Sequence, residues 1–249
     1  MKRWLLLLWL MVPLPVLVWH FGPGQNWLAR DRAHTLIRQA ERAENESKWA
    51  EAESFYQAAG AMLGNQDPKV RLRMDMALVR ARYHQGGAVE AIDGADRILA
   101  DGKFPTMPAA LQREARELAG RLHYYAAWVM RLEGAKRDLW LEEAELARQN
   151  FRLLTESSLA EAEGKADYSK LQQANLENAV RLQRMSMTEL MARPLPEEGN
   201  GMAGQGLSEQ MNKRRGKRGE GKEPGVGETE EGPPAPGAGT TLFPGGPGS

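Results

Sequence analysis

One stretch constrains the fold of this chain more than any other, residues 48–59 with the sequence KWAEAESFYQAA. Its residues Trp49, Ala52, Tyr56 and Ala59 are spaced three or four positions apart, so they would lie on one stripe of an α-helix. Bulky side chains alternate with methyl groups along the stripe, which allows a second helix to approach closely between the aromatic rings. The stretch therefore predicts a helix with another helix packed directly against it.

Residues 85–92, QGGAVEAI, repeat the Glu-Ala step after a glycine turn and place Ala91 in the position of Ala52. Residues 140–154 repeat the order of large and small side chains, with Ala144 in the equivalent position. These segments resemble the tetratricopeptide repeat, a 34-residue unit of two helices joined by a short turn. The resemblance implies antiparallel helix pairs that form a right-handed α-solenoid. The equivalent alanines are 39 and 53 residues apart, so an irregular helical bundle is the alternative.

Between residues 25 and 193 there is no sustained period-two alternation, and good helix formers dominate. Either architecture is therefore all-α. The expected helices cover about 27–44, 49–63, 68–85, 88–100, 111–129, 140–154 and 168–192. Asp67 is the expected N-cap before Pro68, and Gly86 and Gly134 are expected turn positions.

The two ends of the chain differ from this middle part. Residues 4–21 are apolar and follow Lys2 and Arg3, so residues 1–24 are predicted to be a transmembrane signal anchor. A cleaved signal peptide is the alternative, which would leave a secreted or periplasmic protein. Residues 25–196 form the expected helical domain. Gly and Pro make up 21 of the last 53 residues, so residues 197–249 are predicted to be a disordered tail.

No set of residues in the sequence points to catalysis. The chain has no Cys, and its four His residues have no partner at metal-ligand spacing. His123 is expected to be a packed or capping residue, and Glu142 and Glu143 are expected on a solvated helix face. We therefore expect no enzyme activity, metal, cofactor or small-molecule substrate. With 33 basic and 33 acidic residues, the net charge does not favour nucleic acid as a partner.

Two basic clusters are the candidate binding residues. In the tetratricopeptide-repeat family the first helix of each pair lines a concave groove that binds extended peptides. The resemblance therefore implies a partner-binding groove for acidic segments at Arg71, Arg73, Arg80 and Arg82; the alternative is that these arginines are solvated or paired with neighbouring Glu. The second cluster lies in the flexible tail and would contact a polyanion; the alternative is that the tail is simply solvated. Its residues are Lys213, Arg214, Arg215, Lys217 and Arg218.

These features together predict a membrane-anchored, non-catalytic scaffold for protein–protein interactions. The expected location is a bacterial inner membrane, with a single span and most of the chain extracytoplasmic. The layout resembles that of accessory proteins encoded beside bacterial von Willebrand-type and ATPase complexes, which favours a role in an envelope complex. A self-assembling structural bundle of the cell envelope is the alternative function.

Overall fold

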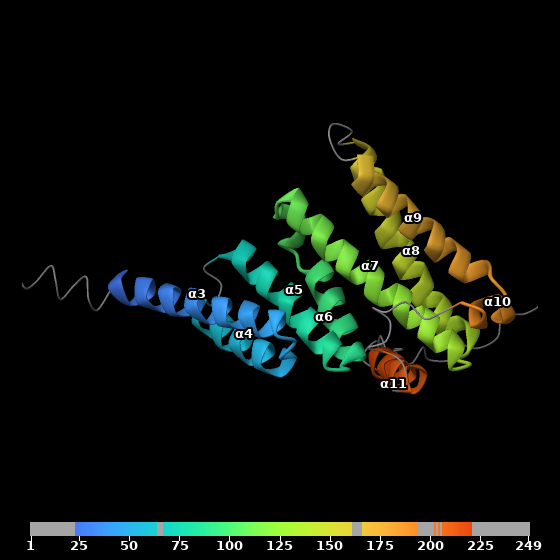
Figure 1. Ribbon diagram of the computed structural model, residues 1–249, viewed down its shortest axis with the longest axis horizontal. Coiled ribbons are helices and arrows are strands. Elements are labelled where there is room, and N and C mark those ends of the chain that lie inside the picture. The colour runs from blue at the N-terminus through green and yellow to red at the C-terminus, as the bar shows by residue number, and fades with distance from the viewer. Residues whose placement is uncertain are drawn as a thin grey trace, which may run out of the picture. The chain divides into compact units, whose positions relative to one another are not determined.

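The computed structural model describes residues 23–63, 67–160, 166–193, 202, 204 and 206–220 (Figure 1). Within these ranges the chain is helical and has no strand, which confirms the predicted all-α class. The helices are α3 (Pro23–Asn45), α4 (Trp49–Leu63), α5 (Pro68–His84), α6 (Ala88–Ala100), the short 3₁₀ helix η1 (Phe104–Thr106), α7 (Ala109–Leu132), α8 (Arg137–Ala160), α9 (Ala166–Arg184), α10 (Met187–Met191) and α11 (Leu207–Glu220).

Local signals set several helix boundaries where the sequence predicted them. The Asp67 carboxylate accepts hydrogen bonds from the backbone N–H groups of Lys69 (3.1 Å) and Val70 (3.3 Å), with Pro68 as the first residue of α5. These N–H groups have no partner inside the helix, so the cap satisfies them. Gly86 and Gly134 end helices in the left-handed region, at φ 87° and φ 73°.

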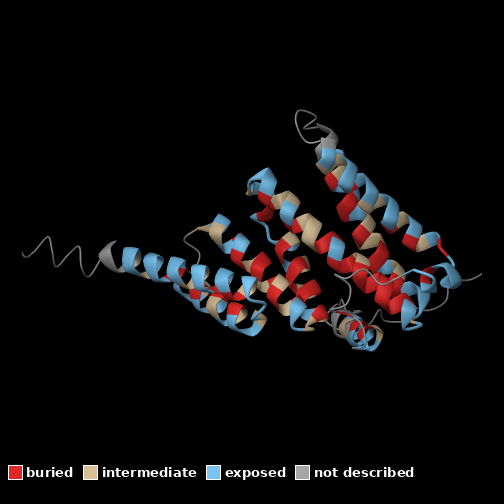
Figure 2. Cartoon of the chain, viewed as in Figure 1, coloured by how far each residue is buried: buried red, intermediate tan, exposed pale blue. Residues whose placement is uncertain are grey.

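Helices that follow one another along the chain pack against one another, from α3 with α4 to α8 with α9. The first helices of two pairs, α5 and α7, also touch directly. The buried residues lie on the faces that these helices turn toward one another (Figure 2). The predicted consecutive helix pairs are therefore present in the described part of the chain.

The predicted packing residues are buried with one exception. Ala52, Tyr56 and Ala59 are buried in a cluster formed by α3, α4 and α5, and Ala91 and Ala144 are buried in a larger cluster centred on α5 to α8. Trp49 is only partly buried. Its indole stacks on His84 of α5, with ring centroids 4.0 Å apart, because it lies at the start of α4 where the core ends.

Two glycines let neighbouring helices approach closely. A Cβ atom at Gly94 of α6 would lie 2.7 Å from Cγ2 of Val79 on α5. A Cβ atom at Gly120 of α7 would lie 2.9 Å from the ring of Phe151 on α8. Both separations are shorter than real Cβ contacts. These helices can therefore pack this closely only because glycine has no side chain at these two positions.

The C-terminal part of the chain differs from the prediction in two ways. The single helix expected over residues 168–192 is two helices, because Ser186 caps α10 and accepts the N–H of Glu189 at 3.1 Å. The new helix changes phase, so that Leu190 is buried while Met187 is exposed. The predicted tail disorder is wrong for residues 207–220, which form α11, because Leu207 and Met211 share one face of that helix and are buried.

The predicted membrane anchor, residues 4–21, lies outside the described residues. Among the helices of the described ranges, none is both long and apolar enough to span a bilayer.

Candidate functional site

A groove of about 410 Å³ lies where α3, α5 and α7 come together, and we call it the α3–α5 groove. Ile37, Val70 and Met74 contribute apolar surface to it, and the ring of Tyr56 reaches it from α4. The remaining lining residues are mostly charged: His34, Glu41, Glu44, Arg73, Ala77, Arg80 and Glu114. Apart from Tyr56, the lining comes from the first helix of successive pairs.

The wall of the groove is held by a polar contact between α3, α4 and α5. The hydroxyl of Tyr56 donates to Oε2 of Glu44 at 2.9 Å, and Oε1 of Glu44 lies 3.7 Å from a guanidinium nitrogen of Arg80. Burial raises the pKa of Tyr56, and the charge of Glu44 and the hydrogen bond to it raise it further. Tyr56 therefore stays a neutral donor, and its hydrogen bond holds the Glu44 carboxylate beside Arg80.

The structure divides the four predicted groove arginines into two pairs. Arg73 and Arg80 line the α3–α5 groove. Arg71 lies outside it and pairs with Asp75 on its own helix, with Nε 3.0 Å from Oδ1. Arg82 also lies outside it, and its Nε is 2.8 Å from Oε1 of Glu53 on α4. Arg73 and Arg80 share one side of α5, and Arg71 and Arg82 share the opposite side, because positions two residues apart on a helix differ in direction by about 200°.

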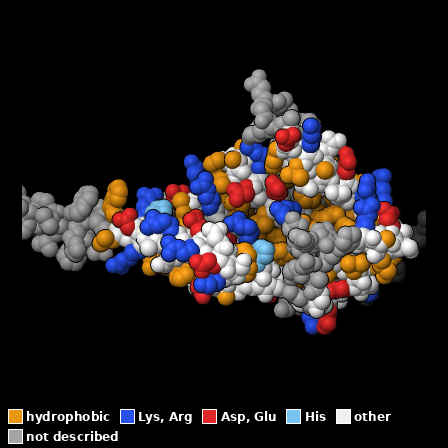
Figure 3. Space-filling view, viewed as in Figure 1, with side chains coloured by type: hydrophobic (Ala, Val, Ile, Leu, Met, Phe, Trp, Pro, Cys, Tyr) orange, Lys and Arg blue, Asp and Glu red, His pale blue; other side chains and the backbone are white. Residues whose placement is uncertain are grey.

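The charge of the groove is mixed rather than strongly basic. Two arginines line it together with three carboxylates, those of Glu41, Glu44 and Glu114. Acidic and basic side chains are likewise interspersed over α3 to α5 on the face seen in Figure 3, while hydrophobic side chains gather nearer the middle of the view. Arg73 is exposed, and no ion pair of its guanidinium is found among the described residues. It is therefore the groove cation most accessible to a ligand carboxylate.

The predicted polyanion cluster lies on α11 instead of a flexible segment. Lys213 is exposed, and its Nζ lies 2.7 Å from Oε1 of Glu209 one turn earlier. Arg215 is exposed, and Arg214 is partly buried. Lys217 and Arg218 also belong to α11, although their side chains are not among those described. Among the described side chains of this cluster, Lys213 and Arg215 are therefore the exposed ones.

A buried charged cluster at the centre of the helical domain is the residue set that sequence reasoning missed. His123 of α7 is 1% exposed, with Nδ1 2.6 Å from Oε2 of Glu143 on α8 and Nε2 3.0 Å from Oδ1 of Asp96 on α6. Burial alone would lower the pKa of His123, but the two hydrogen bonds and the two carboxylate charges raise it to about 9. The imidazole is therefore a cation at neutral pH that joins three helices.

The expectation that Glu143 lies on a solvated face is wrong, because its side chain is buried beside His123. Its position follows Trp140 by three residues and precedes Ala147 by four, which places it on the inward stripe of α8. That spacing in the sequence indicates that Glu143 faces inward. No grouping of His, Asp and Glu suited to a metal ion is found in the parts of the chain that the structure describes.

Comparison of the chain with protein-family models, curated proteins and solved structures found no significant match.

Proposed function

We propose that this chain is a non-catalytic, tetratricopeptide-repeat-like scaffold that binds an extended segment of a partner protein in the α3–α5 groove. The observation that supports this most directly is the origin of the lining, which comes mainly from the first helices of successive pairs. In a right-handed α-solenoid such helices form the concave face, and a concave face binds extended chains without a catalytic pocket. The N-terminal anchor would hold this domain at the extracytoplasmic face of a bacterial inner membrane, within an envelope complex.

The residues of the groove suggest how a partner segment is held. Ile37, Val70 and Met74 would contact apolar side chains of the segment. The exposed guanidinium of Arg73 would bind a carboxylate through two parallel hydrogen bonds. The carboxylates of the groove disfavour a segment that is acidic throughout, so the expected partner segment has an acidic residue beside apolar or basic ones.

Site-specific photo-crosslinking in cells tests this proposal. A photoreactive amino acid replaces Ile37 in the groove of the full-length protein, and the same residue replaces the exposed Leu153 of α8 as a control. We expect a protein adduct from the groove position that is absent from the control position. The adduct should fall strongly with Arg73→Glu and persist with Arg71→Glu, since Arg71 lies outside the groove. Identical adducts from both positions, or no effect of Arg73→Glu, would refute the groove as the binding site.

A further inference from the structure

The N-terminal end of α3 extends past the helices that pack against the rest of it. The guanidinium of Arg30 lies 3.7 Å from Oδ2 of Asp67, the residue that caps α5, so Arg30 is beside the connection between α4 and α5. Among the α3 side chains that the structure describes, from Trp27 onward, Ala33 is the first that is buried. Figure 1 shows this end of α3 projecting beyond the end of α4. The core of the domain therefore does not cover the first turns of α3.

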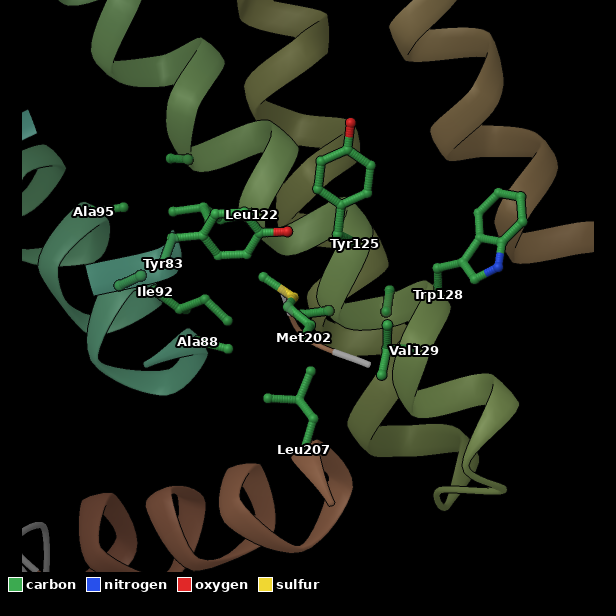
Figure 4. Packing of buried hydrophobic residues seen from close by; sticks show 14 of the residues in the cluster. Tyr83, Ala88, Ile92, Ala95, Leu122, Tyr125, Trp128, Val129, Met202 and Leu207 are labelled. Atoms are coloured by element: carbon green, nitrogen blue, oxygen red, sulfur yellow. The ribbon is translucent and has the colours of Figure 1, made fainter. Parts of the chain in front are cut away.

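Two large apolar side chains are exposed on this projecting end. Trp27 is 61% exposed and Leu28 is 47% exposed, whereas Trp128 is 4% exposed in the large core cluster (Figure 4). Trp27 and Leu28 each point about 120–140° around the helix from the buried Ala33 and Ala40. They therefore face away from α4 and α5. An indole, with its apolar ring and one N–H donor, is favoured at a membrane–water interface.

Basic side chains follow these apolar ones within about one turn. Arg30 and Arg32 are both exposed, with one acidic residue, Asp31, between them. No ion pair of Arg32 is found among the residues that the structure describes. Figure 3 shows hydrophobic side chains and basic side chains close together at this end of α3. A guanidinium in this position suits a lipid phosphate, which it can bind through two parallel hydrogen bonds.

The position of this end along the chain indicates which surface covers it. The anchor of the proposed function, residues 4–21, ends six residues before Trp27. Six residues span about 9 Å as a helix and at most about 22 Å when fully extended. The headgroup region of a bilayer is about 5–8 Å thick on each side. The anchor would therefore keep Trp27 and Leu28 within reach of the headgroup region on the side where it ends.

We propose that this end of α3 is a membrane-docking site, with Trp27 and Leu28 inserted among the lipid headgroups and Arg32 bound to lipid phosphate. The inference rests on the N-terminal anchor of the proposed function, but not on the α3–α5 groove. Leu28 lies nine residues before Ile37 of that groove, which is about 14 Å along the helix axis. Docking therefore holds the α3–α5 groove close to the membrane surface.

Spin labels at single cysteines test the proposal in the full-length protein, because the chain has no Cys of its own. Leu28→Cys is the test position, and Leu153→Cys on α8 is the matched control, since the two leucines are 47% and 45% exposed. The labelled proteins are reconstituted into vesicles of phosphatidylcholine and phosphatidylglycerol. Electron paramagnetic resonance then measures how often each label collides with dissolved oxygen, which concentrates in lipid, and with a nickel complex, which stays in water. We expect the label at residue 28 to favour oxygen and the label at residue 153 to favour nickel.

A second variant tests the contribution of the indole. Trp27→Ser in the Leu28→Cys protein removes most of the inserted apolar surface. We expect the accessibility of the label to nickel to rise toward that of the Leu153→Cys control. Unchanged accessibility would show that Trp27 does not hold this end of α3 in the bilayer.

Flotation of the same vesicles separates this inference from the anchor on which it depends. Protein that does not float with the vesicles refutes the anchor and the docking together. Protein that floats, but whose label at residue 28 is as accessible to nickel as the label at residue 153, refutes the docking alone. Low accessibility of the label at residue 28 to both oxygen and nickel also overturns the proposal, because another protein surface would then cover this end of α3.

Discussion

The buried cluster of Asp96, His123 and Glu143 makes the stability of this protein depend on pH in a defined direction. The pKa of His123 rises from 6.5 to about 9 on folding, because the hydrogen bonds and charges of the two carboxylates outweigh the effect of burial. A pKa that is higher in the folded state means that folding favours the protonated form. The resulting stability is fully present below pH 6.5 and is lost as the pH rises through about 9.

The size of the effect follows from the same shift. A rise in pKa from 6.5 to about 9 corresponds to a stabilisation on the order of 3 kcal/mol in the fully protonated protein. His123 is 1% exposed, so solvent screening reduces this value little. Most of it should disappear between neutral pH and about pH 9.5, which is a large part of the stability of an ordinary domain.

Urea unfolding followed by circular dichroism at about pH 6.5, 8 and 9.5 measures this loss. The reference is the triple variant Asp96→Asn, His123→Gln, Glu143→Gln, which keeps polar groups of similar size but cannot titrate. We expect the unfolding free energy of the wild type to fall by roughly 2–3 kcal/mol more than that of the triple variant over this range. Parallel pH profiles for the two proteins would refute the reasoning.

The single variant His123→Gln separates the ion pair from the pH effect. It leaves the buried carboxylate of Glu143 without its cationic partner, and breaking a buried pair in this way typically costs about 3–5 kcal/mol. The triple variant has no unpaired charge at these positions. We therefore expect it to be more stable than the single variant at neutral pH, and the reverse order would contradict the assignment of a charged cluster.

Further substitutions test the packing and the helix ends. Gly120→Ala should destabilise the protein by about 1–3 kcal/mol in thermal or urea unfolding, because the added methyl group collides with Phe151. Gly60→Ala, inside α4 with its nearest neighbour atom 3.8 Å away, should instead stabilise it by about 0.5–1 kcal/mol. Arg131→Met should lower the free energy of unfolding by about 3 kcal/mol, because the guanidinium donates to two carbonyls at the end of α9 and lies 4.4 Å above the Trp140 ring. Unchanged tryptophan fluorescence and stability would contradict this role. Asp67→Ala should cost about 1 kcal/mol through loss of the α5 cap, and a measured cost near zero would show that the cap contributes little.

Local patterns in the sequence determined the helices and most of their inward faces. The cap at Asp67 and the turn at Gly86 act within one helical turn, so their effect does not depend on the rest of the chain. The buried positions of Ala52 and Tyr56 follow from helical spacing in the same way. These features could be predicted because the residues that produce them are neighbours in sequence.

The tertiary structure alone decided which distant side chains meet. It brings Arg82 to Glu53 of α4 and Arg73 into a groove lined by α3 and α7, and it brings Glu143 to His123, 20 residues away. It also buries Leu207 in the large core cluster, and Glu133, 74 residues earlier, caps its helix. Such contacts depend on how complete helices pack, and the energy gained by each pair depends on the burial that this packing creates. No pattern within a single helix encodes its partner, so the sites of this protein became visible only when its helices were assembled.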